Sequence, residues 1–160
     1  MSEIAYVRGD ATAPSVKGVK VIAHVCNDGG GWGNGFVLAL SRRRPEPEAA
    51  YRAWHRGRAS NGFGLGALQT VRVERDVWVA DMIGRHGVRR AGNAVPVRYD
   101  AIDAALARLA DRALDLGASV HMPRIGCGPA GGEWSRVEPL VTGRLAARGV
   151  TVTVYDHGEG

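Results

Sequence analysis

The stretch MPRIGCGPAGGEW, residues 122–134, decides how the rest of the chain is interpreted. The apolar run before it, residues 118–122, is typical of a buried strand, and the spacing of Ser135 and Glu138 predicts a capping box that opens a helix. A strand, a glycine-rich loop and a helix start direct backbone N–H groups toward an anion. The spacing matches neither the P-loop nor the dinucleotide-binding fingerprint. Taken alone, this loop leaves anion binding and tight packing equally open.

A second loop of the same kind, CNDGGGWGNG, occupies residues 26–35. It follows residues 19–25, a nearly continuous apolar run typical of a central strand covered on both faces. It precedes residues 36–40, which begin a helix. The five glycines within residues 29–35 lose much conformational entropy on folding, so a purely structural use is unfavourable. The pair of loops therefore favours a binding function.

Hydrophobic periodicity places the remaining elements. It predicts helices over residues 35–44, 47–56, 98–116 and 135–147, the last with Pro139 in its first turn. It predicts strands over residues 4–7, 68–73, 77–83 and 150–155, with a hairpin between the second and third. Alternating strands and helices predict an α/β fold whose mixed sheet has helices on both faces. Because ligands bind beyond the carboxyl ends of strands in such sheets, Asp10 and the two loops should converge on one cleft.

The composition fits one domain, residues 1–160, with 45% hydrophobic residues. No apolar run approaches the length of a membrane span and no signal peptide opens the chain, so we expect a cytoplasmic protein without a membrane partner. Cys26 and Cys127 make no disulfide framework, and no cluster of side chains has metal-ligand spacing. The sequence therefore predicts neither a metal nor a cofactor.

The formal charge is +5, and only Lys17 and Lys20 among the basic residues are lysines. Arginine forks suit phosphate, so nucleic acid is one possible partner. The chain has no basic tail, zinc finger or RNA-recognition signature. The arginine and alanine usage of a GC-rich genome is the simpler explanation of the charge.

Three motifs together resemble the macrodomain family, whose members bind or hydrolyse ADP-ribose. They are Gly9-Asp10-Ala11-Thr12, then Ala23-His24-Val25-Cys26-Asn27 leading into Gly33-Asn34-Gly35, and Pro123-Arg124-Ile125-Gly126-Cys127-Gly128. The last, followed by Glu133-Trp134, is the most specific. It is similar to the branch that contains the terminal ADP-ribose glycohydrolases and the ADP-ribose-1''-phosphate phosphatases. The resemblance implies a three-layer α/β/α fold with a mixed central sheet.

The resemblance also implies a role for each motif. Asp10 would accept a hydrogen bond from the adenine amino group, and Tyr155 would stack on the adenine ring. The backbone of the last motif, residues 123–128, which we call the late motif, would bind the diphosphate. Asn27 and the glycine-rich loop after it would hold the distal ribose, whose C1'' carbon carries the modification. The ligand-binding residues so implied are Asp10, Asn27, Gly30, Trp32, Gly33, Asn34, Gly35, Ile125, Gly126, Cys127, Gly128 and Tyr155.

Two departures from the glycohydrolase pattern bear on the chemistry. Those enzymes use a lysine nucleophile on the loop after the middle strands, but residues 84–92 of this chain contain arginines and no lysine. An arginine stays protonated and forms no Schiff base. The aspartate that follows the late motif in those enzymes is also missing, because Pro129 and Ala130 stand there. A covalent lysine mechanism is therefore not expected.

His24 and Asp81 are the candidate acid–base groups, since the phosphatase-type members resemble this chain at His24, Trp32-Gly33 and Asp81. Each has an alternative role, His24 as a buried strand histidine and Asp81 as the cap of the following loop. Strand alternation puts His24 and Cys26 on one face, opposite Val25 and Asn27, which would turn His24 away from the ribose. Asp81, expected near the end of its strand on the ligand edge, is then the better candidate for orienting water.

Four functions compete. The leading hypothesis is a monomeric hydrolase that releases ADP-ribose from modified protein or nucleic acid by attack of a positioned water at C1''. The alternatives are a non-catalytic ADP-ribose reader and an ADP-ribose-1''-phosphate phosphatase. A nucleic-acid-binding protein, suggested by the charge alone, ranks last.

Overall fold

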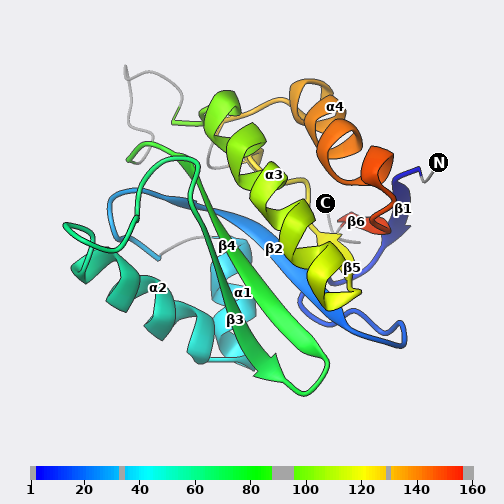
Figure 1. Cartoon of the computed structure of the whole chain (residues 1–160), viewed down its shortest axis with the longest axis horizontal. Helices are drawn as coiled ribbons and strands as arrows, with labels where there is room; N and C mark the ends of the chain where they lie inside the picture. The colour runs from blue at the N-terminus through cyan, green and yellow to red at the C-terminus, as the bar shows by residue number, and fades with distance from the viewer. Residues whose placement is uncertain (1–2, 33–34, 88–95, 129–130, 157–160) are drawn as a thin grey trace.

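The protein is described by a computed structural model over residues 3–32, 35–87, 96–128 and 131–156 (Figure 1). Its six-stranded sheet has the order β1-β6-β5-β2-β4-β3. The strands are β1 (Ala5–Arg8), β2 (Lys20–Asn27), β3 (Leu68–Glu74), β4 (Val77–Arg85), β5 (Ser119–Met122) and β6 (Val152–Asp156). Neighbouring strands run parallel except β3 and β4, which form the expected antiparallel hairpin. The prediction of a mixed sheet is confirmed.

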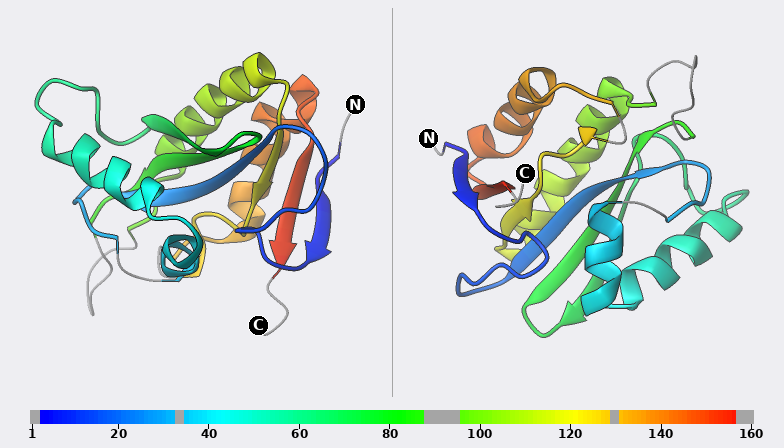
Figure 2. Two further views of the ribbon diagram at one scale, coloured as in Figure 1. Left: turned by 90° about the horizontal axis from the view of Figure 1, so that it is seen from below. Right: turned by 180° about the vertical axis from the view of Figure 1, so that it is seen from behind.

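Helices cover both faces of the sheet, which gives the three layers (Figures 1 and 2). The helices are α1 (Phe36–Arg43), α2 (Glu46–Arg56), α3 (Tyr99–Leu116) and α4 (Trp134–Arg144), the last followed by the short 3-10 helix η2 (Ala146–Arg148). Helices α1 and α2 lie on one face, and α3 and α4 on the other. None of the described helices combines the length and apolar character that a bilayer span requires.

Strand β2 lies between β4 and β5, and its side chains are buried on both faces of the sheet. Val21 and Ala23 belong to the core beneath α3 and α4, whereas Ile22 packs in the core that contains Leu40 and Tyr51 of α1 and α2. This explains the unbroken apolar run that predicted the strand. Helix α3 has the buried apolar face that its hydrophobic periodicity predicts. Gly117, in the left-handed conformation with φ 63°, ends the helix.

Three local expectations are wrong. Helix α4 begins at Trp134, its N-cap residue is Glu133, and no side chain caps it, so Ser135 and Glu138 form no capping box. Glu138 instead accepts a hydrogen bond from the hydroxyl of Tyr6. Pro139 lies inside the helix rather than in its first turn. Strand β4 also continues to Arg85, so Asp81 lies in the middle of the strand rather than near its end.

The carboxyl ends of the parallel strands meet at one edge of the sheet, as the sequence predicted. The segments that follow β1, β2, β4 and β5 all leave the sheet at this edge. Backbone hydrogen bonds close the loop after β5: the Gly132 N–H donates to the Gly126 carbonyl at 2.8 Å, and the Gly131 N–H donates to the Gly128 carbonyl at 2.9 Å. A Cβ at Gly132 would overlap the Gly126 carbonyl group.

We therefore expect Gly132→Ala to reduce the free energy of unfolding by roughly 1–3 kcal/mol, because the loop backbone must move to accept a methyl group. Gly143→Ala is the matched control. It lies near the end of α4, where a Cβ meets no atom within 4 Å, and the better helix propensity of alanine should stabilise the protein by up to about 1 kcal/mol. Urea denaturation of both variants measures the difference. Equal stability of the two variants would show that the contact does not close the loop.

Candidate functional site

Two adjoining cavities lie along this edge and share Phe36 and Pro123 in their walls. The larger, which we call the Asp10 cavity, has a volume of about 440 Å³. It is lined by Gly9, Asp10, Ala11, Gly35, Phe36, Ala39, Arg42, Pro123 and Tyr155. The smaller, the His24 cavity, has a volume of about 150 Å³. It is lined by His24, Val25, Phe36, Val37, Arg85, Pro123, Arg124, Ile125, Gly126 and Cys127. The structure thus brings Asp10 and the late motif to one continuous site.

Asp10 serves as a turn cap and as a wall of its cavity. Its Oδ1 accepts from the Thr12 N–H at 2.9 Å and from the Thr12 hydroxyl at 2.7 Å, and its Oδ2 pairs with Arg43 at 3.2 Å. Partial desolvation raises the pKa of Asp10, but these hydrogen bonds and the arginine outweigh it and lower the pKa overall. Asp10 is therefore a fixed, ionised acceptor at neutral pH.

Tyr155, which lines the Asp10 cavity, is hydrogen-bonded to the buried side chain of His121. The Tyr155 hydroxyl lies 2.8 Å from Nδ1 of His121, and Nε2 of His121 lies 2.8 Å from the Ser119 hydroxyl. His121 is only 1% exposed. Burial, with the nearby charge of Lys20, lowers the pKa of His121 to about 4, so its ring is neutral at pH 7. Sequence reasoning missed His121, whose only signal is a polar residue inside an apolar strand.

The low pKa of His121 predicts a loss of stability in mild acid. The unfolded state takes up a proton near pH 6.5 and the folded state only near pH 4, so the free energy of unfolding falls as the pH drops between these values. Between about pH 7.5 and about pH 5, wild type should lose roughly 2 kcal/mol more than His121→Gln. Urea titrations of both proteins at the two pH values test this. Parallel losses in the two proteins would contradict it.

The loop after β5 contains unpaired backbone donors, and Gly126 of this loop lines the His24 cavity. Within the described residues, the N–H groups of Gly126 and Gly128 have no hydrogen-bond acceptor. Gly126, at φ 76°, packs so closely on Ile102 that a Cβ would lie 2.9 Å from its Cδ1 atom. Ile125 is buried at 2% exposure and anchors the loop, and Cys127 is partly exposed beside it. Burial raises the pKa of the Cys127 thiol, which does not favour a nucleophilic thiolate.

Two expected ligand residues, one at the end of β2 and one in the loop after it, are buried inside the protein. Asn27 is 3% exposed, and its Oδ1 accepts from the N–H groups of Gly29 and Gly31 at 2.8 and 3.3 Å. Trp32 is 6% exposed and donates to the Ser41 hydroxyl at 2.7 Å. Both residues therefore shape the loop, and neither lines the two cavities.

The other expected residues of this loop differ in their surroundings. Gly30 has φ 85°, and a Cβ there would meet the ring of His55 at 2.6 Å. Gly35 is the N-cap residue of α1 and lines the Asp10 cavity. Gly33 and Asn34 lie outside the described residues.

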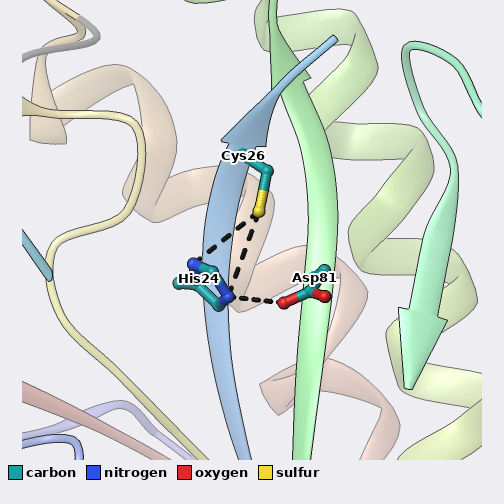
Figure 3. Close-up of side chains that lie close together, drawn as sticks. All are labelled: His24, Cys26 and Asp81. Carbon is teal, nitrogen blue, oxygen red and sulfur yellow. Dashed lines mark hydrogen bonds and ion pairs between the residues drawn. The ribbon is translucent and has the colours of Figure 1, made fainter. Parts of the chain in front are cut away.

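His24 and Asp81 are neighbours across β2 and β4, and Cys26 completes the cluster (Figure 3). His24 Nε2 lies 2.6 Å from Asp81 Oδ1, and Cys26 Sγ lies 3.8 Å from His24 Nδ1. Asp81 has no exposed surface, and its Oδ2 has no hydrogen-bond partner among the described residues. Burial raises the pKa of Asp81 despite the opposing effect of His24. The expectation that Asp81 faces the ligand edge is wrong, because the carboxylate sits behind the imidazole.

His24, expected to turn away from the site, lines the smaller cavity. Its two ring nitrogens nevertheless face Asp81 and Cys26 (Figure 3). The cluster offers three potential metal ligands, which sequence spacing did not reveal because they come from two strands. Two ligand atoms that each bind zinc at its usual distance lie about 3.4 Å apart. The 2.6 Å separation of His24 and Asp81 is instead that of a hydrogen bond.

Two arginines line the smaller cavity. Arg124 and Arg85 line it, and within the described residues no carboxylate does. Arg124 is paired with Asp156, with Nε–Oδ1 at 2.6 Å and Nη2–Oδ2 at 3.1 Å. The Nε of Arg85 is buried with no hydrogen-bond partner among the described residues. A cavity lined by arginines and by a loop with unpaired backbone N–H groups suits an anion such as a phosphate.

Comparison with known proteins decides the family. The sequence matches no protein-family model. A macrodomain protein from Streptomyces coelicolor has a solved structure that is 70% identical in sequence, with a TM-score of 0.87 over 98% of this chain and 100% of its own. The chain belongs to the macrodomain family. A protein of unknown function from Bacteroides thetaiotaomicron is 51% identical to this macrodomain, with a TM-score of 0.92 over 97% of this chain and 98% of its own.

More distant relatives carry functional names. Chromodomain-helicase-DNA-binding protein 1-like of Danio rerio is 31% identical over 98% of the macrodomain, which spans only 16% of that protein. An ADP-ribose 1''-phosphate phosphatase of Meyerozyma guilliermondii is 23% identical, with 97% of this chain and 99% of its own aligned. DarTG of Thermosipho africanus, solved in complex with ADP-ribose, shares the fold at 18% identity, with a TM-score of 0.68 over 89% of this chain and 39% of its own.

Proposed function

We propose that this macrodomain binds ADP-ribose along the carboxyl edge of its sheet and hydrolyses ADP-ribose conjugates at C1''. The observation that carries the proposal is the pairing of two unlike cavities. The Asp10 cavity offers a fixed acceptor and an aromatic ring, and the adjoining His24 cavity offers cations and backbone donors. A nucleobase suits the acceptor and the aromatic ring of the first cavity, and a diphosphate suits the cations and backbone donors of the second. The ligand of the solved DarTG complex supports the choice of ADP-ribose.

The strand order gives the bound ligand a direction. Tyr155 belongs to β6, the late motif follows β5, and β2 and β4 lie next along the sheet. Adenine in the Asp10 cavity and the diphosphate over Gly126 to Gly128 therefore direct the distal ribose toward the ends of β2 and β4. Attack at C1'' takes place at that end. The site positions the scissile bond for water, and positioning alone can lower a barrier by several kcal/mol.

A reader without catalysis is the second candidate. The burial of the His24–Asp81 pair favours a reader, since the Asp81 carboxylate has no exposed surface and cannot contact a bound water at C1''. The phosphatase name of the Meyerozyma relative adds ADP-ribose-1''-phosphate as a substrate to be tested. These possibilities differ in their products. A reader releases nothing, a phosphatase releases inorganic phosphate, and the proposed hydrolase releases ADP-ribose from a macromolecule.

We expect release of free ADP-ribose from mono-ADP-ribosylated protein or nucleic acid under single-turnover conditions, and no trapping of enzyme by borohydride. No lysine occurs in residues 84–92, and Lys17 and Lys20 precede or begin β2, at the opposite edge of the sheet. Chromatography of the nucleotide products measures the release. ADP-ribose binding without release from any of these conjugates would favour the reader.

We also expect adenine recognition to depend on Asp10 and Tyr155. Removing a stacking ring costs roughly 1–3 kcal/mol of binding free energy in nucleic-acid complexes, so Tyr155→Ala should weaken ADP-ribose binding by about 5- to 150-fold. Asp10→Ala should weaken ADP-ribose far more than ribose 5-phosphate, which lacks the base. Calorimetry with both ligands measures these effects. If each variant lost equal affinity for both ligands, the base would not lie in the Asp10 cavity.

A further inference from the structure

A histidine–carboxylate pair lies where β2 and β4 leave the sheet, and neither cavity includes it. Asp28 follows the last residue of β2, and His86 follows the last residue of β4. His86 Nδ1 lies 2.7 Å from Asp28 Oδ2. Asp28 Oδ1 accepts from the Gly87 N–H at 2.9 Å, and the Asp28 N–H donates to the Arg85 carbonyl at 3.0 Å. Both carboxylate oxygens of Asp28 and its backbone N–H are thus fixed by hydrogen bonds.

This arrangement leaves one ring nitrogen of His86 for chemistry. The carboxylate oxygen accepts the hydrogen bond from Nδ1, so in the neutral imidazole Nε2 is the nitrogen with the lone pair. The His86 side chain is 65% exposed, whereas that of Asp28 is 20% exposed. A carboxylate that fixes the imidazole tautomer, with the opposite nitrogen open, is the arrangement used by general bases in hydrolases. His24 is the opposite case, because both of its nitrogens face protein groups.

The pair also lies at the correct end of the site. Arg85 is adjacent to His86 in sequence and lines the His24 cavity, and its backbone carbonyl binds Asp28. In the strand order, β2 and β4 are the strands farther from Tyr155, where the distal ribose of the proposed ligand would lie. We propose that His86 is the catalytic base for hydrolysis at C1'' and that Asp28 is its positioning residue. This inference rests on the proposed function.

The proposed step balances without a cofactor. The water oxygen forms a bond to C1'' while the bond from C1'' to the leaving oxygen breaks, and the leaving oxygen keeps the electron pair. One proton of the water passes to His86 Nε2. From there it goes to the leaving oxygen or, when the leaving group is a stable carboxylate, to solvent. The products are ADP-ribose with a hydroxyl at C1'' and the unmodified acceptor.

His86→Asn is the decisive variant, because its side-chain amide can still donate to Asp28 but provides no basic nitrogen. We expect single-turnover release of ADP-ribose from mono-ADP-ribosylated protein to fall by roughly 10²–10⁴-fold, with ADP-ribose affinity within about 2-fold of wild type. Added imidazole should restore part of the rate to His86→Gly. Asp28→Asn should also slow release, because an amide can donate to Nδ1 and favour the wrong tautomer. Asp111→Asn, at an exposed ion pair with Arg148, is the control and should match wild type.

The outcomes separate the two proposals. Slow release by His86→Asn with unchanged ADP-ribose binding, together with rescue of His86→Gly by imidazole, supports the catalytic role. Wild-type release combined with full activity of His86→Asn overturns that role and leaves the pair as a clamp between two loops, while the proposed hydrolase stands. Absence of release by wild type from all conjugates overturns the hydrolase and this inference together.

Discussion

The parallel pairing of β2 with β4 on one side and β5 on the other is the constraint on which the whole site depends. Parallel strands end at a common edge, so this pairing brings the segments after all three strands together. The burial of β2 on both faces maintains the pairing, because a shift by one residue would exchange the side chains of its two apolar cores. The register in turn places His24 beside Asp81, and the strand ends place Asp28 beside His86.

Local sequence signals predicted most of the fold. The helix at α3 and the two strand–loop–helix units were predicted because periodicity, glycine and apolar runs act over a few residues. The capping box at Ser135 failed because its spacing is only a local preference, and Glu138 instead accepts a hydrogen bond from the distant Tyr6. Tertiary contact overrode the local signal.

The site was less predictable because its polar pairs join distant segments. The Asp28–His86 pair, the His24–Asp81 pair and the His121–Tyr155 pair are separated by 58, 57 and 34 residues in sequence. Their geometry depends on strand register, which a single sequence does not reveal. The sequence could identify Asp10 and the glycine loops because their turn chemistry is local. The family resemblance also implied that Asn27 and Trp32 are ligand residues, although in the structure both are buried by contacts within and behind their own loop.

The buried His24–Asp81 pair has a structural role in the sheet, while its catalytic role stays a prediction. Removing one partner of a buried pair typically costs about 3–5 kcal/mol because the other group is left without compensation. The pair lies within the layer beneath α1, where His24 packs against Trp32 with ring centroids 5.4 Å apart. Its hydrogen bond fixes the position of β2 against β4 where the smaller cavity begins.

Local charge, rather than the net charge of +5, explains the expected affinity for phosphate. Several arginines are already paired, since Arg43 contacts Asp10, Arg44 contacts Glu74 and Arg144 contacts Asp103. Such pairs contribute little field at a distance, because the opposing charge and salt screen them. Arg85 differs because it lines the cavity and, within the described residues, forms no ion pair with a carboxylate, so its charge is available to an anion there. Arg85 also adjoins the proposed base, since its carbonyl accepts a hydrogen bond from the Asp28 N–H and its chain neighbour is His86.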